Sequence, residues 1–224
     1  MMRRFIWIIL SGILFIVMLG NFIFSQYRLR SAVNQAREHL MLIASNGVLL
    51  VDVEALLSVP LIQSAEGGPE YRQISRQLEK IKESNSAIKY VYIMTPSEEA
   101  GFMQFVVDAD PVPEIITAHC PTSLPGDKYD VRNLPGIIAA FDGPSADKDI
   151  NTDAWGVFIS GYAPIRDNEG KSVAILGIDF DGSFIQKMEK KAKRSGLAAL
   201  LTGILFIISF LSLKSWRIAT SLKS

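Results

Sequence analysis

The sequence has a single cysteine, Cys120, and only two histidines among its 224 residues. One thiol cannot close a disulfide within the chain, so the fold must rest on its apolar core. His119 stands beside Cys120, but two adjacent residues seldom make a metal site by themselves. We therefore expect no metal and no other cofactor.

Signatures of catalysis are also missing. With so few imidazoles, a Ser-His-Asp arrangement has almost no candidate base, and Ser160 lacks the glycine two positions earlier that a nucleophile elbow needs. Neither GxxxxGK[ST] nor GxGxxG occurs. Residues 147–151 are spaced like the start of a calcium loop, but Thr152 and Phe158 stand where that loop needs glycine and glutamate. We expect a protein that is not an enzyme.

Acidic residues are absent from both ends of the chain. All 23 lie between Gln26 and Ser195, whereas the ends carry five charges, all basic. The middle segment therefore has a net charge of 18 − 23 = −5, and the ends have +5. Two uncharged apolar runs adjoin the ends, over residues 5–24 and 196–213. As helices at about 1.5 Å per residue, both come close to the roughly 30 Å of a bilayer's hydrocarbon core.

These runs divide the chain into four parts. We predict a first transmembrane helix (1–25), a soluble domain (26–195), a second transmembrane helix (196–213) and a short cytoplasmic tail (214–224). Basic short flanks favour the cytoplasm, which places the long middle segment outside the cytoplasm of a multi-pass protein in the inner (plasma) membrane, in contact with lipid. Basic side chains also flank the domain side of each run, so charge alone leaves the opposite orientation open.

The middle segment is predicted to be α+β. Apolar residues recur at steps of three and four from Leu29 to about Leu57, typical of a long helix that packs on its own domain, pairs with a second copy, or does both. Further helices are predicted over 70–84, 134–141 and 182–194, the last leading into the second apolar run. Four strands are predicted, over 89–94, 102–108, 156–165 and 172–180, and two hairpins connect them. Such strands pair antiparallel, unlike the strands of a βαβ enzyme scaffold.

The second hairpin carries the most specific pattern. The run WGVFISGYAPIRD at 155–167, with Gly170 and then VAILGID at 173–179, resembles the closing hairpin of extracytoplasmic PAS-like (single Cache) sensor domains of bacterial membrane receptors. Residues 90–94 and 105–110 look like the first hairpin of that family, and residues 126–130 like its middle loop. The likeness extends over about residues 31–191.

The resemblance implies a five-stranded antiparallel sheet with a long membrane-proximal helix, presented as a homodimer. It implies the input region of a histidine kinase in a two-component system, a diguanylate cyclase or another nucleotide cyclase, or a chemoreceptor in chemotaxis. In such receptors a small metabolite binds on one face of the sheet, and the helices carry the signal to a cytoplasmic module. Only eleven residues follow Leu213, so we expect that module beyond Ser224 or on a partner. No nucleic-acid partner is expected.

The resemblance also implies one ligand contact. In amine-binding relatives the aspartate of the last strand holds the ligand's ammonium, and Asp179 matches that position. Those relatives have arginine and an aromatic residue where this sequence has Asp153 and Gly156, so the pattern of an α-amino acid site is incomplete.

Nine side chains are candidates for ligand contact, because alternate residues of a strand share one face and loops beside it can close a pocket. Each has a structural alternative: a helix cap for the last-strand aspartate, core packing for the aromatic residues, and turn capping for the second-strand aspartate. A lysine in the acidic loop is a candidate partner for a ligand carboxylate. The nine are Asp179, Tyr162, Ser160, Trp155, Tyr129, Asp108, Tyr90, Tyr92 and Lys148.

A second function class stays open at this point. The domain could be a ligandless dimerisation or scaffold module that tethers a partner in the membrane. A pocket filled entirely by the protein's own Phe, Leu and Met side chains would favour that interpretation.

Overall fold

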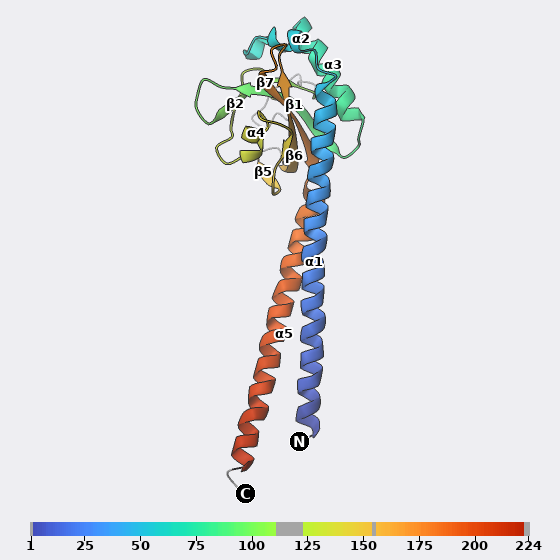
Figure 1. Cartoon of the computed structure of the whole chain (residues 1–224), viewed down its shortest axis with the longest axis vertical. Helices are drawn as coiled ribbons and strands as arrows, with labels where there is room; N and C mark the ends of the chain where they lie inside the picture. Colours follow the sequence, from blue (N-terminus) through green and yellow to red (C-terminus); the bar gives the residue numbers. More distant parts are fainter. Residues whose placement is uncertain (1, 111–122, 154–155, 222–224) are drawn as a thin grey trace. The chain divides into compact units, whose positions relative to one another are not determined.

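The computed structural model describes residues 2–110, 123–153 and 156–221 (Figure 1). Cys120, His119 and Trp155 lie outside these residues. The chain forms two units, one made of Met1–Ala32 with Ile185–Ser224 and the other of Val33–Phe184.

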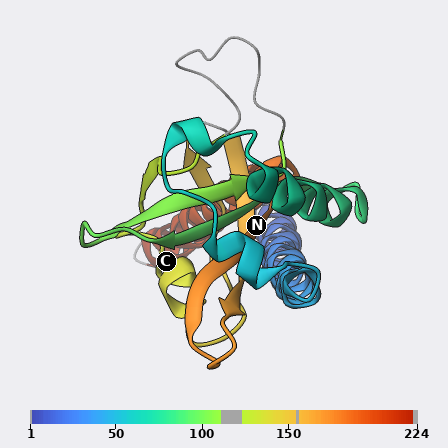
Figure 2. The same ribbon diagram turned by 90° about the horizontal axis from the view of Figure 1, so that it is seen from above.

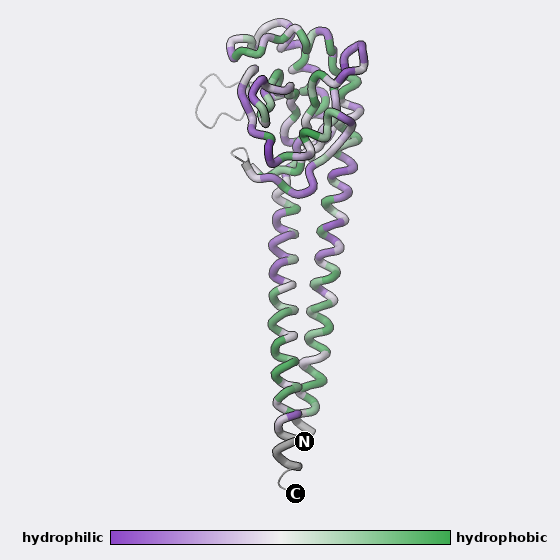
Figure 3. The backbone as a smooth tube through the Cα atoms, turned by 60° about the vertical axis from the view of Figure 1, so that its left-hand side comes forward, coloured by the Kyte–Doolittle hydropathy of each residue, from purple (hydrophilic) through white to green (hydrophobic). Residues whose placement is uncertain are grey.

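The first unit consists of helical residues of α1 (Met2–Val48) and α5 (Ser183–Ser221). Both helices are long and apolar enough to cross a membrane, over Phe5–Val48 and Ser183–Ser215 (Figure 3). The rings of Phe15 and Phe206 stack with centroids 6.3 Å apart. A Cβ on Gly203 would lie 2.9 Å from the Phe15 ring. A small residue of one helix therefore faces a large residue of the other, as in helix pairs that pack closely.

The second unit is built on a seven-stranded antiparallel sheet in the order β3-β2-β1-β7-β6-β4, with β5 also paired to β6. The four predicted strands are present as the four long ones. Three short strands bring the total among the described residues to seven, two more than the five that the resemblance implied. The bounds are β1 Ile88–Pro96, β2 Phe102–Asp108, β3 Lys128–Asp130, β4 Ser145–Ala146, β5 Asn151–Asp153, β6 Gly156–Arg166 and β7 Ser172–Asp181.

The predicted long helix ends earlier than its apolar pattern suggested. Helix α1 stops at Val48, and a separate helix α2 (Val53–Leu57) follows. The side chain of Asp52 causes the restart, because its Oδ1 accepts a hydrogen bond from the Ala55 N–H at 3.1 Å and caps α2. A 3-10 turn, η1 (Gln63–Ala65), leads to the next helix.

Helices α1 and α3 (Pro69–Glu83) lie against one face of the sheet, as Figure 2 shows for α3 beside the strands. The approach of α1 is very close, since a Cβ on Gly161 of β6 would stand 2.4 Å from the Leu40 Cβ. Helix α3 buries four side chains at helical spacing against the sheet: Tyr71, Ile74, Leu78 and Ile81.

The opposite face of the sheet carries an apolar cluster that includes Ile137 of helix α4 (Pro135–Ala139). Met94, Phe105, Ile137 and Tyr162 are buried there. Helices therefore cover both faces of the sheet. The candidate site lies on this second face, beside the cluster.

Candidate functional site

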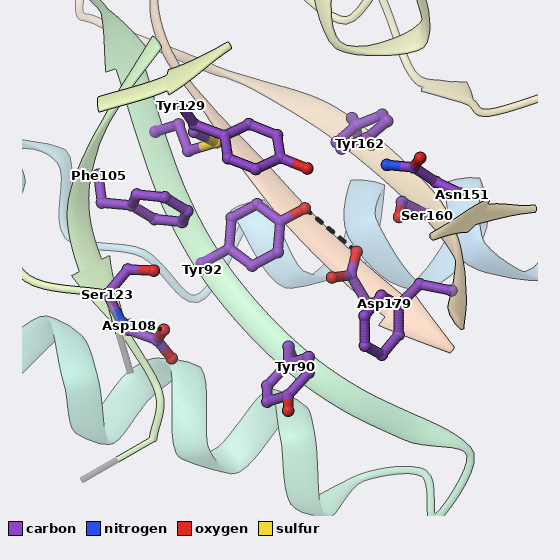
Figure 4. A pocket seen from close by; sticks show the side chains of 12 residues that line it. Tyr90, Tyr92, Phe105, Asp108, Ser123, Tyr129, Asn151, Ser160, Tyr162 and Asp179 are labelled. Atoms are coloured by element: carbon purple, nitrogen blue, oxygen red, sulfur yellow. Dashed lines mark hydrogen bonds between the residues drawn. The ribbon is translucent and has the colours of Figure 1, made fainter. Parts of the chain in front are cut away.

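A cavity opens on the second face of the sheet, over strands β2, β1, β7 and β6 (Figure 4). The volume of the cavity is about 40 Å³, enough for about three water molecules. The lining combines aromatic rings with hydroxyl, carboxamide and carboxylate groups. The lining residues are Tyr90, Tyr92, Met94, Phe105, Asp108, Ser123, Tyr129, Asn151, Phe158, Ser160, Tyr162 and Asp179.

Strand register brings the polar residues together. Across the β1–β7 ladder Tyr90 stands opposite Asp179, and across the β6–β7 ladder Ser160 stands opposite the same residue. On the other side of β1, Tyr92 stands opposite Asp108 of β2. Residues directly opposite in an antiparallel pair point to the same face, as do residues two apart in one strand. All five side chains therefore face the cavity.

Gly177 determines where the Tyr92 ring lies. It is the β7 residue opposite Tyr92, and a Cβ there would be 2.3 Å from the ring carbon Cε2. The absent side chain leaves room for the ring to lie across β7, where the Tyr92 hydroxyl donates to Asp179 Oδ1 at 3.1 Å. Desolvation and the neighbouring Asp179 carboxylate raise the pKa of Tyr92 well above its usual value, so this phenol stays a proton donor.

A second tyrosine connects the cavity to a buried acid behind it. The Tyr162 hydroxyl donates to Asp147 Oδ2 at 3.0 Å, and both residues are buried. Burial raises the pKa of Asp147 to about 6, while the Tyr162 hydrogen bond and the charge of Arg37 on α1 act in the opposite direction. Burial and the charges of Asp147 and Asp179 raise the Tyr162 pKa well above its usual value.

Asp108 is the other carboxylate of the cavity, and it is only 3% exposed. Its Oδ1 accepts from the Asp110 N–H at 2.9 Å, and its Oδ2 accepts from the Ser123 N–H at 3.2 Å. Burial raises its pKa to about 7, against the lowering effect of these two hydrogen bonds and of Lys82. Asp108 therefore does cap the turn that follows β2, as its structural alternative proposed. The same side chain also lines the cavity.

Aromatic rings enclose much of the cavity through edge-to-face contacts. The Tyr90 and Phe158 rings meet with centroids 5.4 Å apart. The Phe105 ring meets Tyr92 at 5.6 Å and Tyr129 at 6.1 Å. Contacts of this kind fix ring orientation. Two lysines stand over the Tyr90 ring, with the Nζ atoms of Lys82 and Lys89 at 5.8 Å and 5.7 Å from its centroid, so this ring already takes part in cation–π contacts.

The charge of the lining has one sign. It includes two carboxylates and, among the residues that the structure describes, no lysine, arginine or histidine. No group of three or more His, Cys, Asp or Glu side chains that could hold a metal ion occurs in the described part of the chain. The arrangement therefore suits a small positively charged organic molecule better than an anion.

Seven of the nine predicted site residues line this cavity: Asp179, Tyr162, Ser160, Tyr129, Asp108, Tyr90 and Tyr92. Lys148 is not among the residues that line this cavity, and its exposed side chain borders a second hollow beside α4, which shares Asn151 with the cavity. Trp155 lies outside the described residues. The helix cap that was the structural alternative for Asp179 is made by Asp181 instead. The Asp181 Oδ1 accepts a hydrogen bond from the Ser183 N–H at 2.8 Å.

Five lining residues were not among the predicted nine. Phe158 could have been found by strand alternation, since it is two residues from Ser160 on β6. Phe105 could not, because it is three residues from Asp108 on β2 and reaches the same face only through the register shift between β1 and β2. Ser123 comes after a proline-rich stretch of sequence and Asn151 begins a three-residue strand, so no local pattern pointed to them. The fifth, Met94, looked like an ordinary core residue.

Comparison with known proteins adds a likeness of fold. No family model and no curated protein sequence matches the chain. Among solved structures, the Campylobacter jejuni chemoreceptor Tlp3 sensory domain with bound isoleucine is similar at 14% identity and TM-score 0.46, over 80% of this chain and 65% of that one. The Vibrio cholerae histidine kinase DctB sensor domain matches at 14% and 0.48, over 77% and 56%. The Pseudomonas fluorescens chemoreceptor CtaA ligand-binding domain with L-leucine matches at 18% and 0.35, over 73% and 62%.

These three are sensory domains of receptors, the class of protein that the sequence resembles. The chain spans 56–65% of their length. Identities of 14–18% and TM-scores of 0.35–0.48 carry no argument about ligand or output. Only the chemistry of the cavity therefore bears on what the protein binds.

Proposed function

We propose that the chain is a membrane-anchored sensor whose cavity binds a small organic cation and whose helices pass the signal to a cytoplasmic output module. One observation carries this proposal: the described lining pairs two buried carboxylates with six aromatic rings and includes no basic side chain. The sensor class agrees with the sequence resemblance.

A cation is the ligand that this cavity can stabilise. Burying a carboxylate costs free energy unless a partner compensates its charge. Asp179 already accepts a hydrogen bond from the Tyr92 hydroxyl. An ammonium beside it would add a charge-assisted hydrogen bond, and the surrounding rings would add cation–π attraction of about 0.5–2 kcal/mol. A free α-amino acid would bring its own carboxylate against two others, where no basic side chain of the described lining could neutralise it.

The lining also bears on the ligandless alternative. A scaffold domain would fill its interior with apolar side chains of its own. Ser123, Asn151, Ser160 and the tyrosine hydroxyls instead bring hydrogen-bonding groups to the cavity, which supports a ligand with polar groups.

We place the sheet unit outside the cytoplasm, between two membrane-spanning helices. The two long apolar helices and the acidic middle segment with basic ends support this arrangement. Alkaline phosphatase fused after Ser195, before the second apolar run, tests it. Alkaline phosphatase needs disulfides that form outside the cytoplasm, so we expect phosphatase activity from intact cells. A fusion protein that is expressed in the membrane but inactive would refute the placement.

The route of the signal follows from one close contact. Leu40 of α1 lies against Gly161 of β6, which stands between the cavity residues Ser160 and Tyr162. A ligand shifts a conformational equilibrium only through its differential affinity for the two states, about 1.4 kcal/mol for each factor of ten. A small movement of β6 on ligand binding would therefore displace α1. The same helix contributes one of the two apolar runs.

A thermal-shift assay on the full chain in detergent tests the ligand class. We expect small alkylammonium ions to raise the melting temperature and matched carboxylates to leave it unchanged. Asp179→Asn should abolish the shift, and Asp142→Asn, at an exposed position outside the cavity, should retain it. A shift that survives Asp179→Asn, or the absence of a shift with every amine at millimolar concentration, would refute the proposal.

A further inference from the structure

The two carboxylates of the cavity stand on different strands with β1 between them. Asp108 ends β2 opposite Tyr92, and Asp179 is near the end of β7 opposite Tyr90. Figure 4 shows the Tyr92 ring between the two acids. One cation can contact one of these carboxylates closely, so the cavity presents a second negative charge at a distance.

The separation of the two acids follows from sheet geometry. Neighbouring strands are about 4.8 Å apart, so β2 and β7 lie about 10 Å apart across β1. The two register positions on β1 differ by two residues, or about 7 Å along the strand. The Cα atoms of Asp108 and Asp179 are therefore about 12 Å apart, with both side chains on the same face.

Asp108 retains capacity for a ligand. Its carboxylate accepts one hydrogen bond each from the backbone of Asp110 and of Ser123, and a carboxylate can accept about four. The nearby ammonium of Lys82 forms its ion pair with Asp110, and no salt bridge between described residues includes Asp108. Burial raises the Asp108 pKa to about 7, and an ammonium bound beside this group would favour its ionised form.

We infer that the ligand is a linear organic dication, an α,ω-diamine whose two ammonium groups are bound by the carboxylates of Asp179 and Asp108. This inference rests on the proposed function and specifies its ligand. Side chains stand roughly perpendicular to a sheet, so the two carboxylates are separated by about the same 12 Å as their Cα atoms. With each ammonium about 2.8 Å from a carboxylate oxygen along that line, about 6–7 Å remains between the two nitrogens. The methylene chain would lie along the Tyr92 ring, where apolar contact replaces water.

The nitrogen separation selects a chain length. An extended aliphatic chain advances about 1.25 Å per bond, so 6–7 Å corresponds to a linker of about four or five carbons. The cavity volume of about 40 Å³ agrees with so small a molecule, since that space holds about three waters, or roughly 90 Å³ of liquid. Shorter diamines would fail to reach both acids.

Isothermal titration calorimetry on the full chain in detergent tests the inference. The ligands are diamines with linkers of about three to six carbons and, for each length, the monoamine that lacks one amino group. We expect the best diamine to bind at least about tenfold more tightly than its monoamine, equivalent to about 1.4 kcal/mol. Affinity should pass through a maximum at a linker of about four or five carbons.

A substitution of Asp108 distinguishes recognition of one ammonium group from recognition of two. Asp108→Asn should reduce diamine affinity to the monoamine level while monoamine affinity changes by less than about threefold, and Asp142→Asn should change neither. The length series on the unaltered protein decides the matter even if Asp108→Asn misfolds.

The outcomes distinguish this inference from the proposed function. If monoamines bind and diamines bind no more tightly at any length, the dication inference is wrong and the cation site stands. If neither class binds, both are wrong.

Discussion

Gly177 is the position where one added methyl group should disturb the site most directly. A Cβ there would lie 2.3 Å from Cε2 and 2.6 Å from Cζ of the Tyr92 ring, far inside van der Waals contact. Since Gly177 is in the middle of β7, paired on both sides, the strand cannot move away. Gly177→Ala should therefore displace the ring.

The free-energy cost of this displacement has two parts. Overpacking of this kind costs about 1–3 kcal/mol. Displacement of the ring also breaks the hydrogen bond to Asp179, worth about 1.5–3 kcal/mol for a charged acceptor. Because the ring relaxes to a new position and recovers part of both, we expect a net loss of about 2–4 kcal/mol. For a unit of this size that is a fall in melting temperature of about 5–15 °C.

Thermal unfolding of the full chain in detergent, followed by near-ultraviolet circular dichroism of the aromatic residues, measures this effect. Gly143→Ala is the matched control, because nothing lies within 4 Å of a Cβ at that glycine. In a Tyr92→Ala background the clash is gone, so Gly177→Ala should be neutral or stabilising by about 0.5–1 kcal/mol. Equal effects of Gly177→Ala with and without the Tyr92 ring would refute the reasoning.

Three further predictions concern the surroundings of the cavity. Burial raises the pKa of Asp108 to about 7 and that of Asp147 to about 6, so the folded protein binds more protons than the unfolded chain between about pH 4 and 7, and stability should fall as pH rises through this window. Asp108→Asn should flatten the upper part of a melting-temperature profile against pH, and an unchanged slope would contradict the assignment. Tyr162→Phe should cost about 1–2 kcal/mol in unfolding experiments, because Asp147 loses its hydroxyl donor; no loss would mean that water replaces it. Gly161→Val should force Leu40 away from β6 and speed hydrogen exchange across residues 33–48, whereas unchanged exchange there would show that α1 is not held by this contact.

Local sequence patterns predicted much of the fold. Alternation with a period of two located the four long strands, and turn residues joined them as hairpins. The same alternation put Ser160 with Tyr162 and Tyr90 with Tyr92 on shared faces, and these pairs do line the cavity. The end of α1 was missed, because an apolar pattern continued through a position where the capping side chain of Asp52 starts a new helix.

The positions that local patterns could not supply come from segments without regular alternation. Ser123 and Asn151 line the cavity, whereas Lys148, only three residues from Asn151, borders only the second hollow that Asn151 also borders. Direction and reach of a side chain in an irregular segment depend on how the segment packs against distant strands. Sequence spacing carries no information about that packing.

By itself the sequence determined two apolar runs, an acidic middle segment and the faces of individual strands, since each of these depends on the chemistry of neighbouring residues. Only the tertiary structure decided that Asp108 and Asp179 share one cavity with β1 between their strands. Strand order and register join residues 71 positions apart in the chain (179 − 108), and they are set by the packing of the whole sheet.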